Sequence, residues 1–251
     1  MKTAIIIPAR LASTRLPGKP LKLIGPEPMI LHVCRRASEC RGVDEVWVAT
    51  DHPEIHKVVV SSGFRSVMTR PDHETGTDRL AEANASIGAD IVVNVQGDEP
   101  FIDPHSIEKA LVPFQQNDGP DMTTLATRFS NQTDIANPNF PKVVLNNRSE
   151  AIYFSRSVVP FPRDQRPDHP SDYPFLKHIG LYAYRQQVLK SLASLPAVPL
   201  EMTEKLEQLR ALYYGFRIGV VEVESTGLSV DTPEDLEAAN QYYRLKESGK
   251  V

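Results

Sequence analysis

Residues 4–20, Ala-Ile-Ile-Ile-Pro-Ala-Arg-Leu-Ala-Ser-Thr-Arg-Leu-Pro-Gly-Lys-Pro, join a short apolar run directly to a loop that carries three cations. The run Ala4–Ile7 is short, continuous and ended by a proline, which is typical of a buried strand in a parallel sheet. In open α/β sheets, ligands bind beyond the carboxyl ends of the strands. The stretch therefore predicts an α/β fold with a ligand site in the loop after its first strand.

Strand and helix patterns alternate through the first half of the chain. Strands are expected at 4–7, 43–49 and 91–95, with helices from 28 onward and at 53–60, 78–87 and 104–114. In the first of these helices, apolar residues at Ile30, Val33, Cys34 and Ala37 follow the spacing of one helical face. Strands separated by helices argue for a mainly parallel sheet flanked by helices.

The second half is less regular. Strands are expected at 122–129, 142–145, 179–184 and 216–223, loops at 131–141 and 160–174, and helices at 200–214 and 236–245. Gly215 is the expected C′ residue of the helix at 200–214. For the last helix, Thr232 is the expected N-cap and Pro233 the first helical residue.

Composition narrows the class of protein. The chain has 251 residues, a formal net charge of −4 and 41% hydrophobic residues, as in soluble globular proteins. It contains no basic stripe interleaved with aromatic residues, so we expect no nucleic-acid partner. No apolar stretch approaches the roughly 20 residues of a membrane span. Two cysteines, Cys34 and Cys40, form no disulfide framework, and we expect a cytoplasmic protein.

The loop after the first strand suits a triphosphate. Backbone N–H groups can surround phosphate oxygens, while Arg10, Arg15 and Lys19 neutralise their charge. The loop lacks the spacing of a Walker A motif. The alternative interpretation is an ordinary basic surface loop.

Two aspartates are candidate metal ligands. Asp98 follows the apolar strand at 91–95, directly after Gly97, a residue that lets the backbone approach a ligand closely. Mg²⁺ prefers one or two carboxylates together with phosphate oxygens. If Thr232 caps the last helix, the carboxylate of Asp231 is free to face the site. The alternatives are that Asp98 is a turn or cap residue and that Asp231 is itself the cap.

Other polar residues carry weaker signals. His178 begins an apolar strand and Arg156 is a surface cation on sequence alone. Three further residues lie off the apolar stripe of the helix at 200–214, which favours a solvated face: Glu207, Gln208 and Arg210. A zinc site at His52 and His56 lacks neighbouring partners.

Several segments, in this order, closely resemble the 3-deoxy-manno-octulosonate cytidylyltransferase family, also called CMP-Kdo synthetases. They are IPARLASTRLPGKPL, VATDHPEI, TRPDHETGTDRLAE, VNVQGDEP, YFSRS, LKHIGLYAY, LEQLRAL and VDTPEDLE. The resemblance implies the α/β fold of nucleotide-diphospho-sugar transferases, with a smaller mixed sheet that completes a sugar pocket. It implies one domain over residues 1–251, with a nucleotide-binding half at about 1–120 and a sugar-binding and dimerisation half at about 121–251. Homodimers are expected.

The resemblance also implies roles for individual residues. Those expected to bind CTP are Arg10, Ser13, Arg15, Lys19 and Gln96, with the segment Arg70–Arg79 near the base and sugar. Those expected around an acidic eight-carbon sugar are Arg79, Arg156, His178, Glu207 and Gln208. Asp98 and Asp231 match the family's two magnesium-binding aspartates, and with Lys19 they form the expected catalytic set.

The implied reaction converts CTP and Kdo to CMP-Kdo and pyrophosphate, which activates the sugar for lipopolysaccharide synthesis. Three alternatives remain: the same reaction on an amino-substituted Kdo, the same reaction on a sialic acid, and a non-catalytic nucleotide-binding relative. One departure from the family pattern lies near Asp231, where Ser229 adds a residue to the segment TGVDTPED that many members carry.

Overall fold

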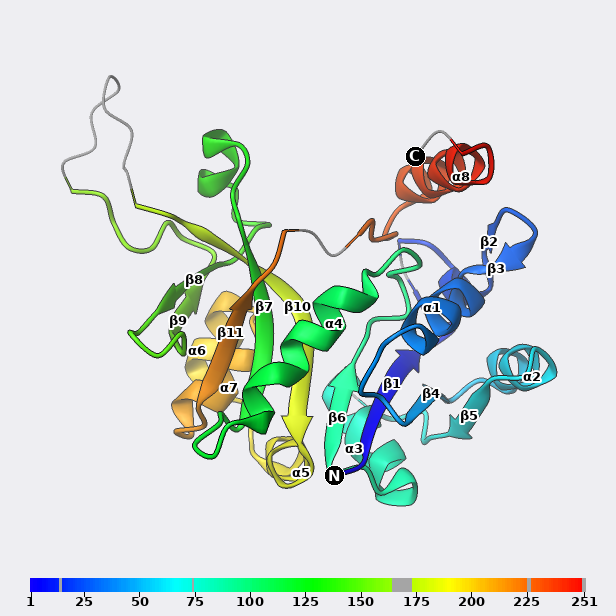
Figure 1. The fold of residues 1–251 in the computed structure, drawn as a ribbon, viewed down its shortest axis with the longest axis horizontal. Coiled ribbons are helices and arrows are strands. Elements are labelled where there is room, and N and C mark those ends of the chain that lie inside the picture. Colours follow the sequence, from blue (N-terminus) through cyan, green and yellow to red (C-terminus); the bar gives the residue numbers. More distant parts are fainter. Residues whose placement is uncertain (14, 74, 164–172, 225–226, 250–251) are drawn as a thin grey trace. The chain divides into compact units, whose positions relative to one another are not determined.

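The computed structural model describes residues 1–13, 15–73, 75–163, 173–224 and 227–249. The chain divides into two compact units (Figure 1). The first comprises Met1–Glu108, Arg185–Ala193 and Thr226–Val251, and the second comprises Lys109–Tyr184 and Ser194–Ser225. The C-terminal segment therefore returns to the first unit. That the two units act as one nucleotidyltransferase domain stays a prediction.

Four parallel strands form the sheet of the first unit, and they confirm the predicted fold class. Their order is β6 (Ile91–Asn94), β1 (Thr3–Ala9), β4 (Glu45–Thr50) and β5 (Arg65–Met68). Residues Ala4, Ile5, Ile6 and Ile7 are all 0% exposed. Because successive side chains of a strand point to opposite faces, both faces of the sheet at β1 are covered.

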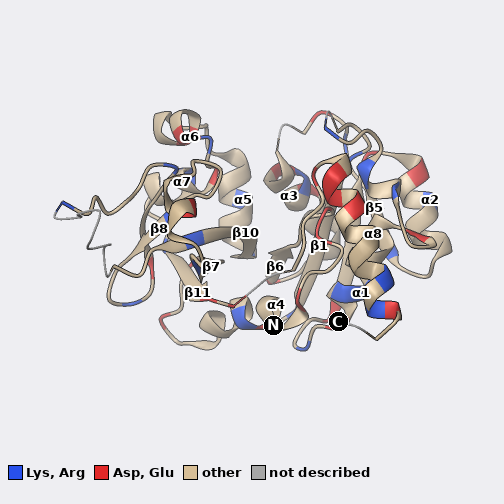
Figure 2. Ribbon diagram, turned by 90° about the horizontal axis from the view of Figure 1, so that it is seen from above, with Lys and Arg blue, Asp and Glu red and all other residues tan. Residues whose placement is uncertain are grey.

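Helices supply that cover. α1 (Met29–Ser38) packs against β1 and β4, and α3 (Gly76–Ile87) packs against β1, β4 and β6. Figure 2 shows these two helices on opposite sides of the strands, with acidic and basic residues interspersed on the helices of the unit. α2 (Pro53–Ser61) packs against β5. α8 (Pro233–Glu247) and α5 (Gln186–Ser194), except for its last residue, also belong to this unit.

Local signals explain where these elements begin and end. α3 starts at a capping box in which Thr75 and Asp78 each accept a backbone N–H from the other, and it ends at Gly88 with φ of 69°. Thr232 caps α8 and Pro233 is its first residue, as predicted. A short antiparallel pair, β2 (Leu23–Ile24) and β3 (Glu27–Pro28), follows the 3₁₀ helix η1 (Lys19–Leu21).

The second unit contains a mixed sheet. β7 (Met122–Arg128) pairs with β11 (Ile218–Glu222) in parallel and with β10 (Leu176–Arg185) in antiparallel fashion. β8 (Lys142–Leu145) is antiparallel to both β10 and β9 (Ala151–Ser155). The chain enters this unit through α4 (Pro104–Leu111) and η2 (Val112–Gln115).

The helix predicted at 200–214 is wrong as a single element. It is two helices, α6 (Pro199–Glu204) and α7 (Gln208–Tyr213), separated by Lys205 in a left-handed conformation with φ of 54°. The amphipathic spacing could not reveal this break, because lysine is not a residue that normally takes a positive φ. Gly215, with φ of 83°, follows α7 as the predicted C′ residue.

Other elements were not expected from the sequence. β5, β9 and α5 escaped prediction, and the loop expected at 131–141 contains the 3₁₀ helix η3 (Gln132–Ala136). Of the loop expected at 160–174, residues 164–172 lie outside the described residues. No helix within the described ranges is both long and apolar enough to cross a membrane.

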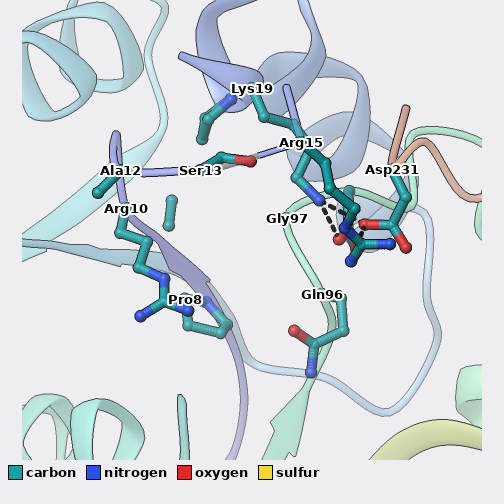
Figure 3. Close-up of a pocket in the computed structure, with 12 residues that line it drawn as sticks. Pro8, Arg10, Ala12, Ser13, Arg15, Lys19, Gln96, Gly97 and Asp231 are labelled. Atoms are coloured by element: carbon teal, nitrogen blue, oxygen red, sulfur yellow. Dashed lines mark hydrogen bonds and ion pairs between the residues drawn. The ribbon is translucent and has the colours of Figure 1, made fainter. Parts of the chain in front are cut away.

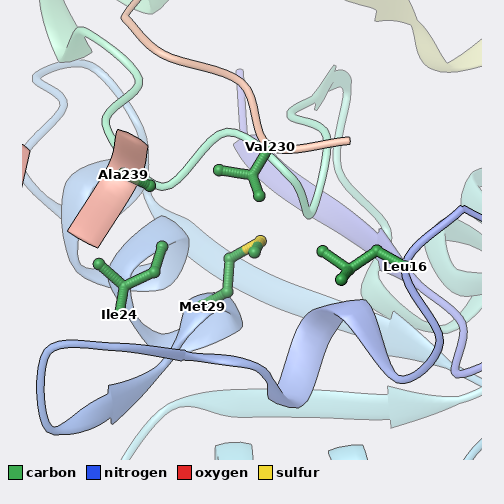
Figure 4. Close-up of a cluster of buried hydrophobic side chains, with 5 residues drawn as sticks. All are labelled: Leu16, Ile24, Met29, Val230 and Ala239. Carbon is green, nitrogen blue, oxygen red and sulfur yellow. The ribbon is translucent and has the colours of Figure 1, made fainter. Parts of the chain in front are cut away.

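A hydrophobic cluster in the first unit joins the segments that carry the candidate site residues (Figure 4). Its buried members come from the basic loop, β2, α1, the segment before α8 and α8 itself: Leu16, Ile24, Met29, Val230 and Ala239. Residues far apart in sequence are thereby held together, and Val230 is adjacent to Asp231. The cluster anchors both the basic loop and the second aspartate.

Candidate active site

A cleft of about 660 Å³ lies at the carboxyl ends of β1 and β6 in the first unit (Figure 3). It is lined by all of the predicted CTP-binding and metal-binding residues, namely Arg10, Ser13, Arg15, Lys19, Gln96, Asp98 and Asp231. The basic loop is therefore part of a concave site, and the alternative of an ordinary surface loop is not supported.

Lys19 lies between the two aspartates. Its Nζ donates to Oδ2 of Asp98 at 2.6 Å and to Oδ1 of Asp231 at 2.9 Å. Burial lowers the pKa of Lys19, but the two carboxylates, Asp98 foremost, more than offset this, and the net pKa is raised above 10.5. The ammonium group is therefore charged at neutral pH, and the carboxylate pair already holds one cation.

Asp98 is placed by the end of β6 and the turn that follows it. A Cβ on Gly97 would lie 3.0 Å from the carbonyl oxygen of Pro8, which is tighter than nearly all such contacts, so glycine favours this close approach of the two segments. The backbone N–H of Val230 donates to the carbonyl oxygen of Asp98 at 2.8 Å. This bond joins the segments of the two aspartates, and the added Ser229 does not separate them.

Asp231 is not the cap of α8, which settles the alternative left open by the sequence. The hydroxyl of Thr232 accepts the N–H of Asp235, while Oδ2 of Asp235 accepts the N–H groups of Asp231 and Thr232. The carboxylate of Asp231 remains free to face the cleft, where it also accepts from Nη2 of Arg15 at 3.2 Å.

The other cleft residues leave donors available. Arg10 is exposed at the end of β1, and Ser13 accepts the N–H of Leu16 through its hydroxyl oxygen at 3.4 Å. With Arg15 and Lys19, the loop places three cations around one concave surface. Such a surface suits a polyphosphate, because guanidinium and ammonium groups form charge-assisted hydrogen bonds to phosphate oxygens.

Glu99 is a residue that the sequence interpretation missed. Burial, reinforced by the neighbouring charge of Asp98, raises the pKa of its carboxyl group to about 8. Oε2 of Glu99 has no hydrogen-bond partner in the described part of the chain. In the sequence, only its position directly after Asp98 could have indicated that Glu99 belongs near the site.

A smaller cavity of about 130 Å³ adjoins the cleft and shares Arg10 and Gln96 with it. Arg79 lines this cavity, with 4% of its surface exposed, and donates to Oγ1 of Thr69 at 2.6 Å. His73 also lines it and is hydrogen-bonded to Glu82 of α3. The segment Arg70–Arg79 therefore contributes side chains beside the cleft, except for residue 74, which lies outside the described residues.

The remaining predicted sugar residues, Arg156, His178, Glu207 and Gln208, belong to the second unit. His178 bonds through Nε2 to Oγ1 of Thr124 at 3.0 Å and stacks edge-on against Phe154. The Thr124 hydroxyl also lies 2.9 Å from the carbonyl oxygen of Leu181, to which it can donate. Burial lowers the pKa of His178 to about 3, so the ring is neutral.

The solvated face expected for the helix at 200–214 is wrong for two residues. Gln208 and Arg210 are only 7% and 8% exposed. Arg210 forms a two-point ion pair with Glu201, in which Nε lies 2.8 Å from Oε2. Buried arginine is favoured where a carboxylate can meet its planar fork, a condition that periodicity alone does not show.

The carboxylate pair fits Mg²⁺. Oδ2 of Asp98 and Oδ1 of Asp231 converge on the ammonium group of Lys19, and the other oxygen of each carboxylate is a hard ligand of the kind that Mg²⁺ takes. Mg²⁺ usually binds one or two carboxylates, with phosphate oxygens and water completing its shell. Across the described ranges no cluster of three or more His, Cys, Asp or Glu residues could hold a metal ion unaided. His52 accepts the N–H of Glu54 as the N-cap of α2.

The cleft brings together three cations of the loop after β1, Asp98 after β6 and Asp231 before α8, a set of groups that suits a nucleoside triphosphate and its metal ion in an α/β fold. A family model described as Cytidylyltransferase matches residues 4–218. The 3-deoxy-manno-octulosonate cytidylyltransferase of Syntrophotalea carbinolica is 47% identical over 97% of this chain and 99% of its own. The chain belongs to the cytidylyltransferase family, in the group of 3-deoxy-manno-octulosonate cytidylyltransferases.

Two further similarities bear on the substrate. A solved structure of CMP:2-keto-3-deoxy-manno-octonic acid synthetase complexed with CTP matches with a TM-score of 0.92 and 44% identity, over 98% of this chain and 100% of that chain. The 8-amino-3,8-dideoxy-manno-octulosonate cytidylyltransferase of Shewanella baltica is 43% identical over 96% of this chain and 98% of its own.

Proposed function

We propose that the protein transfers a cytidylyl group from CTP to Kdo, forming CMP-Kdo and pyrophosphate. The observation that carries this proposal is the cleft in which Lys19 lies between Asp98 and Asp231, beside Arg10 and Arg15. A solved relative with 44% identity contains CTP, and the Syntrophotalea relative is named for this reaction.

In this reaction the anomeric hydroxyl of the sugar attacks the α-phosphorus of CTP, and the bond to pyrophosphate breaks. Arg10, Arg15 and Lys19 bind the phosphates and neutralise the charge that develops on the leaving pyrophosphate. Because Lys19 is held by two carboxylates, its ammonium group is fixed in place before the substrate binds. No covalent intermediate on the protein is required.

Mg²⁺ is the proposed cofactor, held by Asp98 and Asp231. When bound, it would neutralise phosphate charge and lower the pKa of the attacking hydroxyl. The protein's own contribution is the fixed separation of the two carboxylates, which the Val230–Asp98 backbone bond and the cap of α8 maintain.

The sugar is proposed to meet Arg79, Arg156, His178, Glu207 and Gln208. Kdo carries a carboxylate beside its anomeric carbon, and arginine suits a carboxylate. We further propose a cytoplasmic homodimer that activates Kdo for lipopolysaccharide synthesis.

The test is pyrophosphate release from CTP and Mg²⁺ over a panel of acidic sugars: Kdo, its 8-amino relative and a sialic acid. We expect the highest kcat/KM with Kdo. A preference for the 8-amino sugar would reassign the substrate, and binding of CTP without turnover on any sugar would favour a nucleotide-binding role.

A further inference from the structure

In the second unit, the end of β9 and the end of α6 bind each other reciprocally. The guanidinium group of Arg156 donates from Nε to the carbonyl oxygen of Glu204 at 2.6 Å and from Nη2 to that of Lys205 at 3.3 Å. In return, the carboxylate of Glu204 accepts the backbone N–H of Arg156 at 2.9 Å and the hydroxyl of Ser155 at 2.6 Å. Each side chain therefore fixes the main chain of the other.

These bonds stabilise an unusual helix end. Glu204 is the last residue of α6, and Lys205 follows it with a positive φ of 54°, which disfavours residues other than glycine. The last carbonyl groups of a helix lack partners within it and favour a nearby cation. Arg156 supplies both the donors and the positive charge, so it holds the turn that separates α6 from α7.

The reciprocal pair is itself supported by the first residue of β8 and by the segment before that strand. Nη1 of Arg156 donates to the carbonyl oxygen of Pro138 at 2.9 Å. Lys142, which is 0% exposed, donates through Nζ to the carbonyl oxygen of Arg156 and, at 3.2 Å, to that of Asn137. All three side-chain nitrogens of Arg156 thus donate to backbone carbonyl groups, as expected of a residue that holds neighbouring segments of the main chain in place.

The turn held in this way leads directly to Gln208, the first residue of α7. Gln208 is 7% exposed, and its Nε2 has no hydrogen-bond partner among the described residues. A buried amide without a partner costs free energy unless a ligand accepts its hydrogen bonds. Gln208 therefore carries an amide donor that the described residues leave unused, at a position that the α6–α7 turn determines.

We propose that Glu204 is a positioning residue for the acceptor sugar: together with Arg156 it fixes the α6–α7 turn, so that Gln208 presents its amide to a sugar oxygen. This inference rests on the function proposed above. It also assigns Arg156 an effect through Gln208, whereas the family resemblance predicts direct contact between Arg156 and the sugar carboxylate. The two roles predict different results for the variant in which both Arg156 and Glu204 are substituted.

The experiment compares Glu204→Ala, Arg156→Ala, the double variant and Gln208→Ala in pyrophosphate release, with CTP and sugar varied separately. We expect each single change to raise the KM for Kdo at least tenfold and to leave the KM for CTP within twofold. Because Glu204 and Arg156 act as one unit, the double variant should be no worse than the more affected single variant. Glu204→Gln, which keeps one acceptor oxygen, should recover part of the loss.

The matched control is the exposed pair Arg128 and Glu222, which joins β7 to β11 in the same unit at 2.6 Å. Arg128→Ala and Glu222→Ala should leave both KM values unchanged. If Glu204→Ala prevents folding, Ser155→Ala should still raise the KM for Kdo, because it removes one of the four bonds along with the bond from the N–H of Ser157 to the same hydroxyl.

Two outcomes overturn the positioning role while the proposed function stands: a normal KM for Kdo in Glu204→Ala, or losses in the two single variants that multiply in the double variant. The second result would indicate independent roles and direct contact by Arg156. A wild-type protein that uses no acidic sugar at all would overturn the proposed function as well.

Discussion

At the scale of single residues, the main electrostatic feature of the cleft is one ammonium group between two carboxylates. Lys19 is 16% exposed in its side chain, against 26% for Asp98 and 39% for Asp231, so its side chain is the most buried of the three. A preorganised charge of this kind stabilises a transition state without reorganisation during the reaction. Changes that remove charge but keep shape should therefore affect turnover more than folding.

Asp98→Asn tests this directly. The substitution removes a carboxylate that binds Lys19 and is proposed to bind Mg²⁺, and losses on the order of 10²–10³ in kcat follow the removal of one preorganised group. Pyrophosphate release should fall by at least that factor at saturating CTP and Mg²⁺, with an unchanged circular dichroism spectrum. Asp118→Asn, at a side chain that is 81% exposed, is the control and should be fully active. Near-normal release by Asp98→Asn would exclude the proposed role.

His178 provides a prediction on pH. Its pKa is about 3 in the folded protein because of burial, against 6.5 when unfolded. Between these values the unfolded chain binds a proton that the folded chain does not, so stability should fall as the pH decreases from about 6.5 towards 3.

The measurement is the difference in Tm between pH 7.5 and pH 5. It should be smaller in His178→Gln than in the wild type, because glutamine does not titrate. An equal pH dependence in the wild type and His178→Gln would show that His178 is not buried as a neutral ring.

At the scale of elements, the segment before α8 places Asp231 through close contacts with other loops. A Cβ on Gly227 would lie 2.1 Å from the carbonyl oxygen of Phe101, and φ at this glycine is 101°. The segment therefore passes Phe101 at a distance that no other residue permits, and three residues later Val230 bonds to Asp98. The second aspartate is thus positioned by backbone contact as well as by the cap of α8.

Gly227→Ala should consequently lower both stability and activity. A positive φ in a residue other than glycine costs about 1–3 kcal/mol, and the clash with Phe101 adds a displacement of the segment that carries Asp231. Gly42→Ala is a matched control, because Gly42 also has a positive φ of 75° but nothing within 4 Å of its added Cβ. The control should lose stability but keep its kcat. Equal kcat values in the two variants would refute the link between this contact and the site.

The elements show which features a sequence can predict. The buried strands β1 and β6, the cap of α8 and the loop with Lys19 follow from local signals, namely apolar runs, Thr-Pro at a helix start and clustered cations. The helix break at Lys205 did not follow, because it depends on Arg156, which lies far away in sequence and binds the end of α6. The burial of Arg210 was missed because the break brings Arg210 to Glu201, on the other side of it, and a continuous helix does not predict that pair. Helical periodicity also did not indicate that Gln208 is buried.

At the scale of the whole molecule, the second unit carries solvent-exposed apolar side chains. Ile152 of β9, Met202 of α6 and Tyr213 of α7 are 58%, 59% and 58% exposed. These three elements adjoin one another, since α7 packs against both β9 and α6. Exposed apolar residues on adjoining elements are candidates for an interaction surface. They support the proposed homodimer.

The prediction is that the wild-type protein has about twice the mass of the 28.0 kDa chain in light scattering coupled to size-exclusion chromatography. Ile152→Glu and Met202→Glu should each shift it to the monomer, because an unpaired charge inside an apolar interface is costly. Val60→Glu is the control: Val60 is 49% exposed on α2 of the first unit, and the variant should remain dimeric. A wild-type protein that is monomeric at tens of micromolar, or variants that dimerise as the wild type does, would place any dimer interface elsewhere or exclude it.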